Sequence, residues 1–258
     1  MGRRFGQHFL ARKSILDQIA SAACPEPPSL LIEIGPGKGA LTEPLLSLAP
    51  RVIAIEVDPI LVQYLRQKFR EPIEKNQLTL IEDDILRSDL AGLSGESRPV
   101  IAGNLPYYIT SPILERVFSL DRRWQRAVFL VQAEVGARLV AQPGSKVYGY
   151  LSVLTQVHAR ADLLLEVSRT AFRPIPKVDS AVVRLEPRDA AADWGIEDRN
   201  AFLRFASVCF RHKRKTLRNN LSELYGKDRL DSLPEGRLRA EQMGIAELAA
   251  LHRKLEAA

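Results

Sequence analysis

The segment Asn104-Leu105-Pro106-Tyr107 combines groups that could hold and align an aromatic amine. Asn104 can accept one N–H at its side-chain carbonyl, and a rigid Leu-Pro turn can present the backbone carbonyl of Leu105 as a second acceptor. The ring of Tyr107 offers a face on which an unstacked base can lie. Two acceptors would favour a tetrahedral amino nitrogen with a free lone pair, so the tetrapeptide predicts group transfer to the exocyclic amine of adenine.

A glycine-rich turn, Gly35-Pro36-Gly37-Lys38-Gly39, follows Glu33-Ile34 where a buried strand is expected to end. Glycines at such a turn let a ligand approach the backbone closely. The turn is not the dinucleotide-binding pattern, whose N–H groups bind a pyrophosphate, and Pro36 removes one of those donors. We therefore expect a nucleoside ligand without phosphate, such as S-adenosylmethionine. The alternative is a plain strand-to-helix turn.

Two acidic side chains at later strand ends strengthen this interpretation. Glu56 lies 21 residues after Gly35, where a carboxylate can accept hydrogen bonds from both ribose hydroxyls. Asp84 follows the third expected strand and could accept the adenine amino group of the cofactor. Taken singly, either acid could be a solvated strand end. Together with Asn104 they predict a site that works by alignment and electrostatics, without a metal.

Short apolar runs alternate with helix-like stretches through the first two thirds of the chain. Such runs are typical of strands buried on both faces of a parallel sheet with right-handed crossovers. The expected strands are 30–34, 52–57, 78–81, 100–102 and 127–131, and the expected helices are 41–48, 59–69, 112–118 and 133–140. Segments 163–167 and 181–185 could form an antiparallel pair at the sheet edge. The sequence thus predicts an α/β fold with a Rossmann-like sheet.

The character of the sequence changes after Leu185. Pro187, the alanines at 190–192 and Gly195 are typical of a linker. Beyond it, the expected helices are 200–210, 213–225 and 246–255, with no strand between them. We therefore expect a Rossmann-like domain over residues 1–187 and a small C-terminal all-α domain over residues 198–258.

The composition is that of an ordinary globular protein, with 46% hydrophobic and 26% charged residues. No apolar run reaches the ~20 residues that span a membrane, and the N-terminus lacks a signal-peptide pattern. Two cysteines and four histidines show no metal-type spacing, so we expect a cytoplasmic protein without a metal. Nothing indicates a heptad repeat, and a monomer is expected.

A basic run near the C-terminus and a formal net charge of +6 favour a polyanionic partner. Residues 204–218 contain six lysines or arginines and no acid. Such a cluster contacts phosphates, which positions RNA without specifying its sequence, although the alternative is a solvated helix face. The RNA-binding candidates are Arg211, Lys213, Arg214, Lys215 and Arg218, together with Lys177 in a separate basic stretch.

Five segments in chain order closely resemble the ribosomal small-subunit RNA adenine dimethyltransferases. They are 4–10, 33–42, 104–107, 172–183 and 214–221, and the resemblance covers nearly the whole chain. It implies an enzyme whose Rossmann-like domain binds S-adenosylmethionine and whose helical domain helps engage the small ribosomal subunit. The implied reaction is N6,N6-dimethylation of two adjacent adenosines in the 3′-terminal hairpin loop of 16S rRNA.

The same resemblance implies roles for single residues. In the N-terminal segment 1–28, His8 and Leu10 would line the cofactor pocket. Gly35 would contact the methionine part with Gly37 nearby, Glu56 the ribose and Asp84 the adenine, while Asn104 would bridge the cofactor and the target amine.

Two positions depart from the family pattern. His8 and Tyr108 each stand where relatives commonly carry Asn. The side-chain contact at position 8 is therefore open, and the ring of Tyr108 could either reshape the target pocket or stack on a neighbouring base. Two other functions also stay open. One is adenine N6-methylation of large-subunit rRNA or DNA, and the other is a non-catalytic RNA-binding assembly or transcription factor on the same scaffold.

Overall fold

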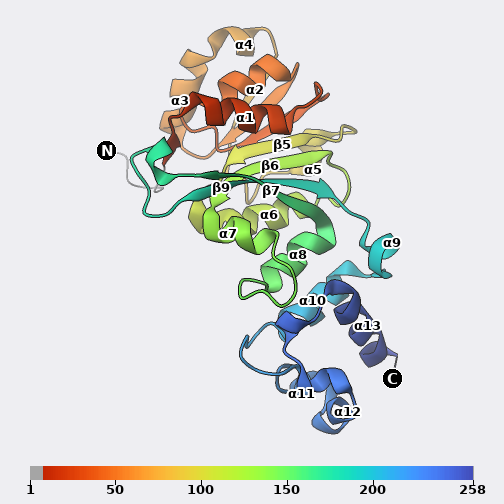
Figure 1. Ribbon diagram of the computed structural model, residues 1–258. Helices are drawn as coiled ribbons and strands as arrows, with labels where there is room; N and C mark the ends of the chain where they lie inside the picture. Colours follow the sequence, from red (N-terminus) through yellow and green to blue (C-terminus); the bar gives the residue numbers. More distant parts are fainter. Residues whose placement is uncertain (1–7, 258) are drawn as a thin grey trace. The chain divides into compact units, whose positions relative to one another are not determined.

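The computed structural model describes residues 8–257, in which a seven-stranded sheet has the order β4-β3-β2-β5-β6-β9-β7 (Figure 1). The pairs β2·β3, β2·β5, β3·β4 and β5·β6 are parallel, and β6·β9 is antiparallel. The predicted α/β fold is confirmed, with each expected strand in this sheet. The strands are β2 (Leu31–Ile34), β3 (Val52–Glu56), β4 (Leu78–Glu82), β5 (Val100–Asn104), β6 (Arg126–Gln132), β7 (Ala159–Val167) and β9 (Ser180–Pro187).

Every residue of β2 and β3 is buried, as continuous apolar runs require. Both faces of the central strands must therefore be covered by helices. Figure 1 shows α1 (Lys13–Ala23), α2 (Thr42–Leu48) and α3 (Pro59–Lys68) on one side and α6 (Thr110–Phe118) on the other. Helix α1 was not predicted from the sequence. It buries Ile15, Leu16 and Ile19 in the core beneath it, and each such side chain contributes about 1.5–3 kcal/mol.

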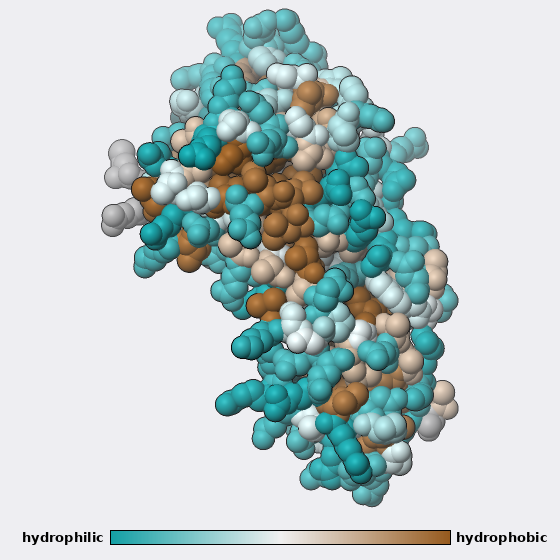
Figure 2. All heavy atoms as spheres, in the orientation of Figure 1, coloured by the Kyte–Doolittle hydropathy of each residue, from teal (hydrophilic) through white to brown (hydrophobic). Residues whose placement is uncertain are grey.

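Strands β9 and β7, the last two of the chain in this sheet, lie at one of its edges. As expected, they lie next to each other, with β7 outermost. Figure 2 shows a largely hydrophilic face on which apolar side chains gather where Figure 1 draws α1 and β7. Leu163 and Leu164 of β7 are both exposed. A separate antiparallel pair joins β1 (Phe9–Leu10) to β8 (Phe172–Arg173) and thereby ties the N-terminal segment to a loop before β9.

The chain divides into two compact units. Within the described residues, one reaches Gly136 and resumes at Ala161–Pro187, and the other comprises Ala137–Arg160 and the residues from Arg188 on. The domain boundary expected at 187 coincides with one of these edges, but 137–160 groups with the C-terminal helices. The reason is that the ring of Tyr148 packs edge-on against Phe210, with centroids 5.8 Å apart.

The expected linker was wrong at one point, because Ala190–Trp194 forms helix α9. The Asp189 carboxylate accepts the Ala192 N–H, which satisfies a free donor at the start of this helix. Gly195 ends the helix with a left-handed φ of 63°. Alanine favours the helix in between, although the run lacks the large apolar residues that reveal a helical pattern.

The remaining helices are short or belong to the C-terminal part of the chain. They are α4 (Arg70–Glu74), α5 (Leu90–Ser94), α7 (Ala133–Leu139), α8 (Tyr150–His158), α10 (Arg199–Cys209), α11 (Leu217–Tyr225), α12 (Lys227–Asp231) and α13 (Ile245–Glu256). Residues 213–216, expected to start a helix, form a loop before α11. Across residues 8–257, no helix has both the length and the apolar character needed to cross a bilayer.

Candidate active site

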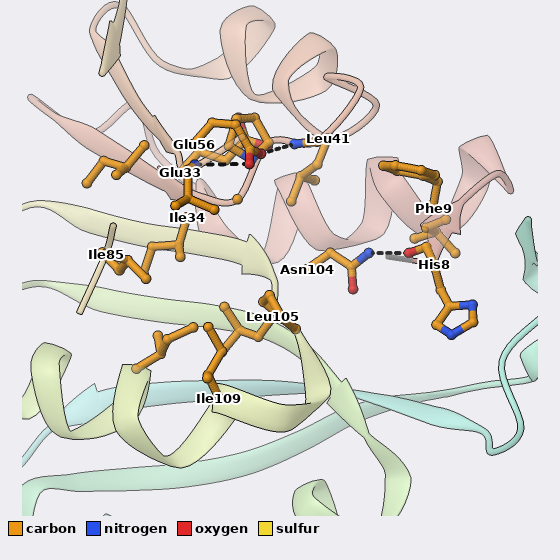
Figure 3. Close-up of a pocket in the computed structure, with 18 of the residues that line it drawn as sticks. His8, Phe9, Glu33, Ile34, Leu41, Glu56, Ile85, Asn104, Leu105 and Ile109 are labelled. Atoms are coloured by element: carbon orange, nitrogen blue, oxygen red, sulfur yellow. Dashed lines mark hydrogen bonds between the residues drawn. The ribbon is translucent and has the colours of Figure 1, made fainter. Parts of the chain in front are cut away.

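A pocket of about 300 Å³ lies at the carboxyl ends of the central strands (Figure 3). The loops that follow β2, β3, β4 and β5 all line it, because these strands are parallel neighbours and their ends share one edge of the sheet. The structure thus brings together every residue predicted for cofactor binding or catalysis. These are His8, Leu10, Gly35, Gly37, Glu56, Asp84, Asn104, Leu105, Pro106 and Tyr107.

The glycine turn after β2 shapes one wall of the pocket. Gly35 and Gly37 have φ values of +65° and +58°, a left-handed conformation that other residues adopt at a cost. A Cβ atom on Gly35 would meet nothing within 4 Å, so this backbone faces open space. A Cβ atom on Gly37 would lie 2.9 Å from the Phe9 ring. The turn therefore leaves room for a ligand at Gly35 and is closed by the N-terminal segment at Gly37.

The Glu56 carboxylate, at the end of β3, stabilises this turn through hydrogen bonds. Its Oε2 accepts the Gly37 N–H at 3.0 Å, and its Oε1 accepts the N–H groups of Val57 and Asp58 at 3.0 and 3.1 Å. Burial raises the pKa of Glu56, while these three backbone bonds lower it. A carboxylate has about four acceptor sites. One site is therefore left, which suits a single ribose hydroxyl without disturbing the turn.

Glu33, in β2, is a pocket residue to which the sequence analysis gave no role. Figure 3 shows it beside Glu56. Its side chain is buried, and its Oε2 has no hydrogen-bond partner among the described residues. Burial away from water raises the pKa of Glu33 to about 8; the neighbouring Thr42 hydroxyl opposes the rise, and the Glu56 carboxylate adds to it. An unpaired buried carboxyl oxygen is costly, and a ligand that brings an N–H donor or a positive charge would relieve that cost.

Asp84 and its neighbour Asp83 differ in how much hydrogen-bonding capacity they have left. Asp83 uses both oxygens, because Oδ1 accepts the Asp84 N–H and Oδ2 accepts the Ser88 hydroxyl at 2.7 Å. These bonds lower the pKa of Asp83, with the Ser88 bond the largest cause. Asp84 accepts one bond, from the Leu86 N–H at its Oδ1. Its second oxygen can therefore serve a ligand, which favours Asp84 as the sequence analysis expected.

The side-chain amide of Asn104 is oriented by the N-terminal segment. Its Nδ2 donates to the backbone carbonyl of His8 at 3.1 Å, drawn as a dashed line in Figure 3. The Oδ1 atom makes no hydrogen bond to residues 8–257 and is left for a ligand. Because the partner at position 8 is a main-chain oxygen, His in place of Asn leaves this contact intact. The imidazole itself donates from Nδ1 to the Pro174 carbonyl at 2.9 Å.

The rest of the tetrapeptide is held from the neighbouring strands. The Leu105 N–H donates to Leu130 of β6 at 3.0 Å, while the Leu105 carbonyl accepts no bond from the described part of the chain. The hydroxyl of Tyr107 lies 2.6 Å from the Ser180 Oγ of β9. Burial raises the pKa of Tyr107. Its ring stacks on His8 with centroids 6.2 Å apart. Two unused acceptors and a fixed ring thus lie along one loop.

Comparison with known proteins identifies the chain's relatives. The family described as "Ribosomal RNA adenine dimethylase" matches residues 1–251. The chain belongs to this family. The "Ribosomal RNA small subunit methyltransferase A" of Levilactobacillus brevis is 41% identical, covering 95% of this chain and 82% of that protein. The protein of the same name from Acidobacterium capsulatum is 41% identical, covering 98% and 90%.

A solved structure has the same fold as this member of the ribosomal RNA adenine dimethylase family. A dimethyladenosine transferase from Plasmodium falciparum superposes with a TM-score of 0.80 at 24% identity, covering 97% of this chain and 98% of that one. The family match and the two relatives confirm the resemblance inferred from the motifs. Residues 4–7 of the first motif lie outside the residues that the structure describes. S-adenosylmethionine is the methyl donor, and the pocket residues fit it. Gly35 leaves room, Glu33 has an unpaired oxygen and Asp84 has a free acceptor.

In this family member the predicted RNA-binding cations differ in their partners. Arg218 forms a paired contact with the Asp231 carboxylate, Arg211 lies 3.4 Å from Glu223, and Lys213 lies 3.7 Å from Glu241. Arg214 and Lys215 are exposed and form no ion pair with the described residues. Lys177 is exposed in the other unit. The free charges in the loop before α11 are therefore those of Arg214 and Lys215.

A buried amide, which the sequence analysis missed, fixes the shape of this basic loop. The Nδ2 of Asn220, in α11, donates to the carbonyls of Cys209 and His212 at 2.8 and 3.3 Å. Its Oδ1 accepts the His212 N–H at 3.2 Å. These bonds replace backbone partners that the turn out of α10 cannot supply. Asparagine at this place in the sequence gave no signal, because its partners are main-chain atoms.

We predict that replacing Glu33 by Gln changes how stability depends on pH. The folded-state pKa of Glu33, about 8, lies above the ordinary value of 4.5, so ionisation opposes folding. As the pH rises from 5 to 8, the wild type should lose stability relative to Glu33→Gln, and the difference should level off above pH 8. Calorimetric melting temperatures at each pH measure it. Glu26→Gln, at an exposed position, is the control for charge. Parallel curves for Glu33→Gln and wild type would contradict the prediction.

Proposed function

We propose that this protein dimethylates N6 of two adjacent adenosines in the 3′-terminal hairpin loop of 16S rRNA, as a step in small-subunit biogenesis. The observation that carries the proposal is the free Oδ1 of Asn104, held in the same pocket as the glycine turn. The names of the two relatives, which specify the small ribosomal subunit, support the choice of substrate. We further propose that the protein acts in the cytoplasm as a monomer.

The cofactor half of the pocket supplies binding and orientation. Bound S-adenosylmethionine would contribute an electrophilic methyl group on a sulfonium. The backbone at Gly35 and the unpaired oxygen of Glu33 suit the methionine part, because they offer space and an acceptor for its ammonium group. Glu56 would accept from a ribose hydroxyl and Asp84 from the adenine amine. The Glu56 and Asp84 carboxylates are already held by backbone N–H groups, so these two side chains need little rearrangement on binding.

The target half of the pocket prepares the amino nitrogen. The N6 lone pair of adenine is delocalised into the ring, so the amine is a weak nucleophile. The Asn104 Oδ1 and the Leu105 carbonyl would accept its two N–H bonds and favour a tetrahedral nitrogen. After one methylation a single N–H remains, and one of the two acceptors suffices to orient it again. The nitrogen releases a proton to water in each round, so no metal or covalent nucleophile is needed.

Charge would supply most of the attraction for RNA, and the cost of unstacking would favour an adenine in a loop as the target. An adenine must leave its stack to reach Asn104, and this costs less in a hairpin loop than in a duplex. Arg214 and Lys215 would contact phosphates, because their charges are not neutralised by described acids. Arg211, Lys213 and Lys177 would add to this attraction. Arg218, engaged by Asp231, would contribute mainly by positioning α11.

We predict that Asn104→Ala lowers methyl transfer by about 100-fold or more, since an acceptor for the reacting amine is lost. Most cofactor affinity should remain, because Gly35, Glu56 and Asp84 are unchanged. Transfer of labelled methyl groups to small ribosomal subunits measures the first effect, and calorimetry with S-adenosylmethionine measures the second. Full activity in this variant would remove the proposed role in orienting the amine.

We predict that the wild-type enzyme labels isolated small ribosomal subunits, on N6-dimethyladenosine, and neither large subunits nor duplex DNA. The three substrates are incubated separately with labelled S-adenosylmethionine, and the product nucleosides are identified by mass spectrometry. Label in large subunits or DNA would favour the other methyltransferase functions. If calorimetry detected no cofactor binding, a non-catalytic RNA-binding protein would be the better interpretation.

We predict that the double variant Arg214→Glu with Lys215→Glu raises the KM for small subunits by at least about ten-fold, because two phosphate contacts become repulsive. The salt dependence of binding should also weaken, by roughly one unit of slope for each lost contact. The matched control is Lys227→Glu with Arg237→Glu, which makes the same charge change at exposed positions outside the loop. Equal effects of the two pairs would show that only net charge matters.

A further inference from the structure

Tyr108 is a large aromatic side chain that lines the pocket and yet is 65% exposed. It lies in the middle of a short 3₁₀ turn, Tyr107–Ile109, directly before α6. Its neighbours on the turn, Tyr107 and Ile109, also line the pocket but are only partly exposed. Tyr108 therefore lies at the mouth of the pocket, where most of the residue is exposed to solvent.

The geometry of the turn separates the two tyrosines. A 3₁₀ turn has about three residues per turn, so successive side chains point roughly 120° apart. Tyr107 is directed inward by its bond to Ser180 and packs against His8. Tyr108 cannot face the same base from this backbone. Since 65% of Tyr108 is exposed, the residue lies mostly outside the pocket and does not fill it.

We infer that Tyr108 is a stacking platform for the nucleotide next to the target adenine. This inference rests on the proposed function. When one base of a single strand occupies the pocket, the adjoining base is left outside at the mouth, where it has lost its stacking partner. An exposed aromatic ring replaces that partner for any base, because every base has a π face. With two adjacent adenosines in the proposed substrate, this neighbouring base would itself be an adenine.

The lining of the same pocket also carries a charge suited to the backbone of such a strand. Lys38, in the glycine turn, lines the pocket, is exposed and forms no ion pair with residues 8–257. Its ammonium lies 5.0 Å from the centroid of the Phe9 ring, which orients the side chain. An exposed aromatic ring and an unpaired cation in the lining of one pocket fit a nucleotide better than an apolar peptide.

The test compares Tyr108→Ala and Tyr108→Phe with the wild type. The probe is an RNA hairpin whose loop contains an adenine next to 2-aminopurine, a base whose fluorescence is quenched by stacking. S-adenosylhomocysteine is present so that no transfer occurs. The wild type and Tyr108→Phe should quench the fluorescence, and Tyr108→Ala should not. Loss of one stacked base should also weaken RNA binding by about 5- to 150-fold. Tyr64→Ala, at an exposed tyrosine outside the pocket, is the control.

Three results would overturn the inference. The first is quenching by Tyr108→Ala equal to that of the wild type, and the second is no quenching by the wild type. The third is a loss in Tyr108→Phe as large as that in Tyr108→Ala. Calorimetric affinity for S-adenosylmethionine should be equal in all variants, which excludes unfolding as the cause. Failure of the proposed function is distinguishable, because the wild type would then transfer no methyl groups to small subunits.

Discussion

The parallel pairing of β2 with both β3 and β5 is the constraint on which the site depends. It brings the glycine turn, the Glu56 carboxylate and the Asn104 amide to one edge of the sheet, although they are far apart in the chain. Both strands are buried along their whole length, so a shift of register would move residues at a strand end out of the core and into water. The chemistry at the edge is therefore positioned by packing in the core.

Hydrogen bonds to the main chain then hold the side chains of Glu56 and Asn104 in place in the pocket. Glu56 holds the turn through the Gly37 N–H, and the carbonyl of His8 holds the Asn104 amide. Both bonds satisfy one part of a functional side chain and leave another part free. Because the protein uses only some of the hydrogen-bonding atoms of each side chain, the side chain is held in place and its remaining atoms are available to a ligand. Glu33 differs, because its unpaired oxygen gives the protein a buried cost that a ligand can remove.

The sequence was informative where a pattern is local and repeated. Continuous Val, Ile and Leu runs located the strands, and strand-end motifs located the pocket residues. Helix α1 was missed, although its pattern is local and its apolar residues at 15, 16, 19, 20 and 23 all fall on one helix face. The contact between His8 and Asn104 joins residues 96 apart through a main-chain oxygen, so no residue type could reveal it. The environment of Glu33 likewise depends on what packs around it. Sequence identified the groups, and tertiary structure determined which of their atoms are free.

The amide of Asn220 gives the basic loop a property that its charges alone would not. Asn220 is neutral and buried, and it makes three hydrogen bonds to the main chain of Cys209 and His212. Dissolved ions screen exposed charges strongly and the hydrogen bonds of a buried neutral side chain very little. High ionic strength should therefore weaken the proposed contacts between this loop and RNA while leaving the loop's conformation unaltered, so that the dissociated protein can rebind without refolding this segment.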